Sequence, residues 1–219
     1  MRKKFVYSVE TVFLLVCVWA VQSLLLLLFT RFGVFEFFHR TSDIWRLCPY
    51  LLMPHIISLL AGMAAIPLVW EKAVRKIEFQ KIGFRVPANL QAETLCAAGL
   101  FLIFAGYVLF LDDKAATLLS LSPELVFSLS YRWFLIVLAE EIFYRGLIQR
   151  RLSNLCCHWC GLVFASIIFA FWGHISLPFM DNLVLRFPFG LIVGYLYLRS
   201  GSLLLPVGAH WVYNLVFAL

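Results

Sequence analysis

Charged residues are scarce in this chain. Asp, Glu, Lys and Arg make up 14% of its 219 residues, and 63% are hydrophobic. A soluble domain carries about 25% charged residues. The apolar residues also lie in long blocks rather than on one face of an amphipathic pattern. Scarce charge and long apolar blocks together exclude a soluble globular protein and predict an all-α, polytopic transmembrane helical bundle.

Signatures of several other protein classes are missing as well. The sequence has no HExxH pair, no second CxxC or HxxxH, no internal repeat and no low-complexity linker. The first apolar run is too long for a signal peptide and no clear cleavage site follows it, so we expect a retained first span. Residues 1–219 are therefore predicted to form a single membrane-embedded domain.

The cysteines near the middle of the chain form one cluster, Cys156, Cys157 and Cys160. Its CxxC could supply half a zinc site, but no partner motif exists. We therefore expect reduced thiols at a membrane boundary, with acylation of one of them as an alternative.

About seven segments are long enough to cross a bilayer. The expected spans are 6–30, 46–70, 92–111, 124–148, 160–180, 183–199 and 202–219. The fifth and sixth spans are the hardest to divide, because Pro178 and Asp181-Asn182 allow a short turn or a broken helix. Segment 71–90 alternates basic and apolar residues, as a cytoplasmic surface helix would.

The connections between spans alternate in charge. Basic residues flank the first span and fill the second connection, and Arg150, Arg151 and Arg199 follow later spans. The opposite connections hold acids such as Asp112 and Asp113. The positive-inside rule then places the amino terminus in the cytoplasm. The net charge of +6 is spread over these connections, where it sets topology and contacts membrane lipids, so we expect no nucleic-acid binding.

Two adjacent acids and an arginine interrupt the fourth predicted span. Glu141 and Arg145 are four residues apart, the favoured order for an ion pair on one helix face. Glu140 is turned about 100° away from Glu141 and shares a face with Tyr144. We therefore expect Glu141 and Arg145 to support the site structurally and Glu140 to be a general base.

Later spans hold a few more polar residues. His210 and Asn214 share a face of the last span, where both can donate hydrogen bonds to an oxyanion. His174 ends the aromatic segment that begins at Phe169. Arg132 and Arg186 lie near outer ends of spans, where such side chains can snorkel to the interface.

The order EExxxR, a Phe-rich segment ending in His, then HxxxN resembles the CPBP family of intramembrane proteases. That family includes the type II CAAX prenyl endopeptidases and the bacterial Abi proteins. All three motifs fall within residues 140–214, and the helical core 92–219 matches the usual extent of the family. The resemblance implies an integral, multi-pass protease, and the short chain fits a member from a bacterial cytoplasmic membrane.

The resemblance also implies roles for single residues. Glu140 would activate water, His174 would hold or polarise it, and His210 and Asn214 would stabilise the oxyanion. The family's second motif is usually FxxxH, but Ala170 stands four residues before His174, between Phe169 and Phe171. We expect the aromatic lining to be kept with shifted placement.

The depth of His174 depends on where the fifth span begins. A start near Leu162 places His174 level with Glu140 and His210, whereas a start near Cys157 leaves it near the outer surface.

Gly190 and Gly194 form a GxxxG pair that would let a neighbouring helix approach closely. The sequence does not distinguish such packing from a chance occurrence, and it leaves the oligomeric state open.

The predicted function is hydrolysis of a peptide bond near the C-terminus or leader of a membrane-associated or lipidated peptide, without a cofactor. One alternative is a zinc-dependent protease in which Glu140, His174 and His210 bind the metal. Another is a non-enzymatic immunity or transport protein. The sequence does not identify the substrate or its cleavage site.

Overall fold

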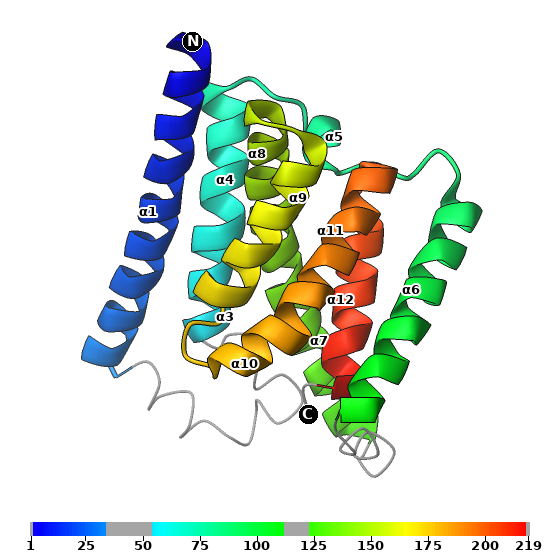
Figure 1. Cartoon of the computed structure of the whole chain (residues 1–219). Coiled ribbons are helices and arrows are strands. Elements are labelled where there is room, and N and C mark those ends of the chain that lie inside the picture. The colour runs from blue at the N-terminus through cyan, green and yellow to red at the C-terminus, as the bar shows by residue number, and fades with distance from the viewer. Residues whose placement is uncertain (1, 34–53, 112–122, 218–219) are drawn as a thin grey trace.

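The structure, a computed structural model, describes residues 2–33, 54–111 and 123–217, and every regular element in these residues is helical (Figure 1). The first half begins with α1 (Arg2–Arg31). A second continuous helical segment follows, made of α3 (Pro54–Leu59), η1 (Leu60–Ala65), α4 (Ile66–Val69) and η2 (Trp70–Val74). The first half ends with α5 (Phe79–Ile82) and α6 (Leu90–Leu111). The η elements are π-helical, with wider turns than an α-helix.

The second half contains three further continuous helical segments and the last helix. They are α7 (Pro123–Glu141), η5 (Ile142–Gln149) and α8 (Arg150–Leu155); α9 (His158–Ile167) and η6 (Ile168–Trp172); α10 (Phe179–Asp181), η7 (Asn182–Arg186) and α11 (Phe187–Ser200); and α12 (Leu204–Phe217). The last span, predicted to begin at residue 202, begins at Leu204. The predicted start of the second span lies outside the described part of the chain, because residues 46–53 do.

Four of the described helices are long and apolar enough to cross a membrane: Phe5–Arg31, Pro54–Val74, Leu90–Phe110 and Phe179–Ser200. His158–Trp172 is apolar but shorter. Only 11% of the most apolar window of the first helix is buried against protein, which leaves most of it for lipid. The chain is an integral membrane protein of helices; the count of about seven spans and the cytoplasmic amino terminus stay predictions.

Helix ends gather at two faces of the bundle. The amino terminus, the connection 75–89 and the turns at 155–158 and 200–203 lie at one end, which we call the N-terminal face (Figure 1). The turn 173–178 and the carboxyl end of α12 lie at the other, the C-terminal face. Most of the third connection, including Asp112 and Asp113, lies outside the described residues.

The surface helix predicted over 71–90 is wrong. Between Val74 and Leu90 only α5 is helical, because Lys76 at φ 58° and Gly83 at φ 121° take left-handed conformations that interrupt a right-handed helix. A Cβ at Gly83 would lie 2.9 Å from side-chain atoms of Leu203 and Tyr197. The amide of Leu203 donates to the Gly83 carbonyl at 2.9 Å. The segment is therefore folded onto the turn between α11 and α12.

The division between the fifth and sixth spans also differs from prediction. The helix that was expected to reach residue 180 ends at Trp172. The turn falls at 173–178, so it includes Pro178, one of the two places expected for it, and ends before Asp181-Asn182. Asn182 Nδ2 donates to the His174 carbonyl at 2.9 Å. This bond fixes the turn and lets the next helix begin straight after Pro178.

A buried ion cluster joins α1, η2 and α8 near the N-terminal face. Arg151 is 0% and Glu71 1% exposed, and Arg151 Nε donates to Glu71 Oε1 at 2.7 Å. Arg150 also pairs with Glu71, at 2.7 Å, and Arg75 pairs with Glu10. The interpretation of Arg151 as a topology signal alone missed this internal role, because no sequence spacing links it to Glu71.

The cysteine cluster lies in the turn between α8 and α9. Cys157 and Cys160 form a disulfide, so the expectation of reduced thiols is wrong for this pair. Cys156 is free and exposed.

The GxxxG pair of α11 packs against α9. A Cβ at Gly190 would lie 3.2 Å from side-chain atoms of Phe169 and Ser166, and one at Gly194 would lie 2.7 Å from Leu162. The two glycines therefore permit close approach of the helices, which is the specific packing that their spacing allows.

Candidate active site

Glu141 and Arg145 form the ion pair predicted from their spacing. Glu141 ends α7 and Arg145 lies in η5, and Arg145 Nε is 3.3 Å from Glu141 Oε2. Their side chains are 0% and 1% exposed. The guanidinium also donates to the Gly190 carbonyl at 3.3 Å and lies over the Phe169 ring at 4.9 Å. Arg145 thus ties η5 to the helices that carry the aromatic segment and the glycine pair.

The second oxygen of Glu141 contacts a histidine. Glu141 Oε1 lies 2.7 Å from His210 Nδ1, although the two residues are 69 positions apart. Since a carboxylate only accepts, Nδ1 carries the proton and donates it. Sequence reasoning gave Glu141 only the arginine as a partner, and the histidine contact depends on how α12 packs against α7.

Glu140 faces a different neighbour. Its side chain is 15% exposed, and Oε2 lies 3.7 Å from His210 Nε2, beyond direct hydrogen bonding. Tyr144, one turn later, lines the same cavity. A Cβ at Gly173 would collide with the Tyr144 hydroxyl, so glycine permits this close approach. Glu140 therefore lines the cavity, is partly exposed and makes no direct hydrogen bond to His210.

His174 lies in the turn after η6. Its Nδ1 is 2.9 Å from the Phe169 carbonyl, which only accepts, so Nδ1 donates and Nε2 is left to accept when the ring is neutral. The helix before it begins at His158, close to the boundary that was expected to leave His174 near the outer surface. His174 nevertheless lines the cavity that Glu140 and His210 line.

The shifted aromatic motif has a structural cause. Residues Ile168–Trp172 are π-helical, and the Gly173 amide donates to the Ile168 carbonyl five residues back, at 3.0 Å. In this wider turn Phe169, five residues before His174, takes the position that the residue four before it would take in an α-helix. Phe169 packs edge-on against His174 at 4.9 Å and against His210 at 5.7 Å. The expectation that the aromatic lining is kept is confirmed.

Asn214 lies one turn after His210 on α12 and is 7% exposed. It lines the same cavity as His210. Phe189 of α11 stacks on Tyr213 at 4.3 Å and packs edge-on against His210 at 5.0 Å. These aromatic contacts hold the polar face of α12 toward the cavity.

One cavity of about 600 Å³ brings the predicted residues together. Glu140, His174, His210 and Asn214 all line it. Its walls also include parts of the first third of the chain, outside the predicted core 92–219. These are Leu15, Val18, Trp19 and Gln22 of α1, His55 and Leu59 of α3, and Met63 of η1.

Arg132 and Arg186 also line this cavity. Both were predicted only to snorkel toward the interface. The Arg132 guanidinium lies over the Trp133 ring at 5.2 Å. The cavity thus contains a carboxylate and three histidines together with two guanidinium groups.

The residues proposed as zinc ligands do not form a metal site. In the described part of the chain, no three His, Cys, Asp or Glu side chains lie close enough together to hold an ion. Nδ1 of His210 is engaged by Glu141, and Nδ1 of His174 by the Phe169 carbonyl. A shared metal would have to use the remaining ring nitrogens, of which Nε2 of His210 lies 3.7 Å from Glu140 Oε2.

Comparison with known proteins supports the predicted relation. Residues 122–216 match the family model of Rce1-like type II CAAX prenyl endopeptidases, so the resemblance to CAAX/CPBP-family proteases is confirmed. Neither the curated proteins nor the solved structures give a match. The match covers the glutamates, His174, His210 and Asn214, and it indicates an intramembrane endopeptidase acting on peptide substrates.

Proposed function

We propose that the protein hydrolyses a peptide bond near the C-terminus of a membrane-associated, lipidated peptide, with water activated by Glu140. The observation that carries this proposal is the convergence of Glu140, His174, His210 and Asn214 on one cavity, with His210 held by Glu141. Glu140 lies on α7, His174 lies in the turn after η6, and the other two residues lie on α12. The meeting of these three segments is a property of the fold and not of local sequence.

The reaction divides among these groups. Glu140 takes a proton from water as the water oxygen bonds to the carbonyl carbon of the scissile peptide. His174, whose Nδ1 donates to Phe169, accepts a hydrogen bond from that water through Nε2. When the C–N bond breaks, the protonated carboxyl of Glu140 returns the proton to the leaving amine, and a carboxylic acid and an amine are released.

The oxyanion is stabilised from α12. The Asn214 side-chain amide donates to it, and His210 donates through Nε2 when its ring is protonated at both nitrogens. Glu141 at Nδ1 and Glu140 near Nε2 flank that ring and can balance its charge. Glu141 thus orients His210 in the way that a carboxylate orients the histidine of a catalytic triad.

The charge of the cavity favours a substrate that is cleaved near its C-terminus over a leader peptide. Arg132 and Arg186 in its lining suit a peptide that ends in a free carboxylate, because guanidinium groups bind carboxylates well. Eight residues of α7 separate Arg132 from Glu140, a rise of about 12 Å. A few extended residues span that distance.

The direct test uses purified protein in liposomes and a prenylated peptide with a free carboxyl terminus. Mass spectrometry of the products identifies the bond that is cut. Products from the wild type and none from Glu140→Gln support the proposal. No cleavage of any lipidated peptide by a correctly folded wild type would contradict it.

A further inference from the structure

A second pocket, of about 240 Å³, lies at the N-terminal face, away from the cavity of Glu140. It is formed by α5, α8, the start of α9 and the end of α11. Lys81, Arg85, Arg150 and His158 line it, and none of its described lining residues is acidic. The catalytic proposal makes no use of this pocket.

Positive charge is in excess around the pocket. Arg150 pairs with Glu71, but the same carboxylate also pairs with Arg151. In the ion cluster as a whole, three arginines share the carboxylates of Glu71 and Glu10. Lys81 and Arg85 have no ion-pair partner within the described ranges, so the pocket suits an anion.

The Arg85 side chain is already fixed at the pocket. Its Nε donates to the Gly201 carbonyl at 2.8 Å, and its Nη2 to the Ser200 carbonyl at 3.3 Å. Gly201 has φ 60°, and a Cβ there would collide with the guanidinium. Because the side chain is held in place, binding an anion would cost little further loss of rotamer freedom.

The height of the pocket in the bundle points to the ligand. α8 ends at Leu155, α9 begins at His158 and α11 ends at Ser200, so helix ends surround the pocket at the N-terminal face. Lipid headgroups lie at the ends of membrane-spanning helices. Basic pockets between such helices bind anionic headgroups, and the amino end of α9 adds favourable dipole charge.

We propose that this pocket binds a phosphate group, supplied by the headgroup of an anionic phospholipid such as phosphatidylglycerol. The phosphate oxygens would accept hydrogen bonds from Lys81, Arg85 and Arg150. This site is separate from the candidate active site, and the proposal stands whether or not the protein is a protease. Free inorganic phosphate has the same chemistry and is the other source to distinguish.

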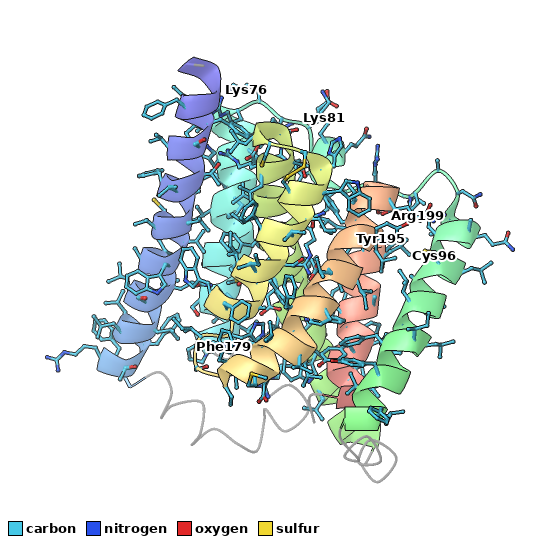
Figure 2. The ribbon with its side chains drawn as sticks, in the orientation of Figure 1. Lys76, Lys81, Cys96, Phe179, Tyr195 and Arg199 are labelled. Carbon is cyan, nitrogen blue, oxygen red and sulfur yellow. A yellow bond between two sulfur atoms is a disulfide. The ribbon has the colours of Figure 1, made fainter. Side chains whose placement is uncertain are left out.

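Two lysines of one connection give a matched pair for the test. Lys81 lines the pocket, whereas Lys76 does not, and both are exposed at the N-terminal face, where Figure 2 labels them. Native mass spectrometry of the detergent-purified full chain would be titrated with phosphatidylglycerol, with phosphatidylcholine and with inorganic phosphate. Lys81→Gln should weaken binding of phosphatidylglycerol about fivefold, and Lys76→Gln should leave it unchanged.

Each outcome decides the proposal. Tighter binding of phosphatidylglycerol than of phosphatidylcholine, lost only in Lys81→Gln, supports the headgroup site. Binding of inorganic phosphate that is lost in the same variant supports the pocket and identifies free phosphate as its occupant. Equal binding of both lipids, or equal effects of the two substitutions, would overturn the site. Arg85→Gln, which removes a second basic group of the pocket, should weaken binding of phosphatidylglycerol in the same way.

Discussion

Glu141 places its two carboxylate oxygens 2.7 Å from Nδ1 of His210 and 3.3 Å from Nε of Arg145. One buried acid therefore neutralises a buried cation and orients a histidine of the cavity. This leaves Nε2 as the ring nitrogen that His210 can offer to a substrate. The neighbouring Glu140 lies 3.7 Å from His210 Nε2, beyond hydrogen-bond distance, and in the proposed mechanism it is the group that reacts with water.

Glu140→Gln should lower the rate of peptide cleavage at least about 100-fold, because the amide cannot take a proton from water. Membrane insertion and thermal stability should stay near those of the wild type. Cleavage is followed by mass spectrometry of the peptide products in liposomes. Glu93→Gln, which removes a carboxylate paired with Arg199 outside the cavity, is the matched control. Full activity in Glu140→Gln would rule out the general-base role.

Glu141→Ala should reduce the yield of folded protein, since it leaves Arg145 buried without its carboxylate. Breaking a buried pair in this way costs about 3–5 kcal/mol. Size-exclusion chromatography and thermal unfolding in detergent measure the effect. The fraction that still folds should also cleave peptide more slowly, because His210 loses the acceptor at Nδ1. A variant with normal yield and normal activity would show that the contact to His210 has no role.

Phe169→Ala and Phe171→Ala test the shifted aromatic motif. Phe169 is 1% exposed and contacts both His174 and His210, whereas Phe171 packs against Phe179 at 5.2 Å. We expect Phe169→Ala to cost about 3–5 kcal/mol of stability and most of the activity. Phe171→Ala should have the smaller effect in both assays. The reverse order would place the functional aromatic residue at the other position.

Arg186→Gln should remove a preference for substrates with a free carboxyl terminus. The wild type is expected to cleave a peptide acid about tenfold faster than the same peptide with a terminal amide, the equivalent of about 1.4 kcal/mol. The variant should cleave both at the slower rate. Arg31→Gln, near the C-terminal face but outside the cavity lining, is the control. Equal cleavage of acid and amide by the wild type would reject carboxylate recognition while leaving the protease intact.

Chelation separates a glutamate mechanism from a metal mechanism. We expect 1,10-phenanthroline to change the cleavage rate by less than about twofold, because in the proposed mechanism Glu140 activates the water without a metal ion. Loss of activity that added Zn²⁺ restores would support Glu140, His174 and His210 as ligands instead. Metal content measured on the purified protein provides an independent readout.

The parts of the site that lie on a single helix could be predicted from the sequence. The Glu141–Arg145 pair follows from spacing of four residues, and so does the shared face of His210 and Asn214. Long apolar blocks were enough to predict a helical membrane protein. These features are local, so the periodicity and hydropathy of the sequence are enough to predict them.

Features that depend on packing between distant segments were not accessible in this way. Nothing in the sequence links Glu141 to His210 or Glu71 to Arg151. The π-helical turn that brings Phe169 to His174 adds one residue to a turn, and residue patterns based on the α-helix miss it. The same wide turn helps explain why His174 reaches the cavity from a helix that starts at His158.

The first helix supplies part of the wall of the candidate active-site cavity while lying outside residues 122–216, which match the protease family. The candidate catalytic groups all lie in the matched stretch, whereas part of the wall that would contact a substrate comes from outside it. Substitutions at Leu15, Val18 or Trp19 could alter which peptide fits without touching an acid or a histidine. Proteins with the same motifs and different first helices would then share a reaction and differ in what they cut.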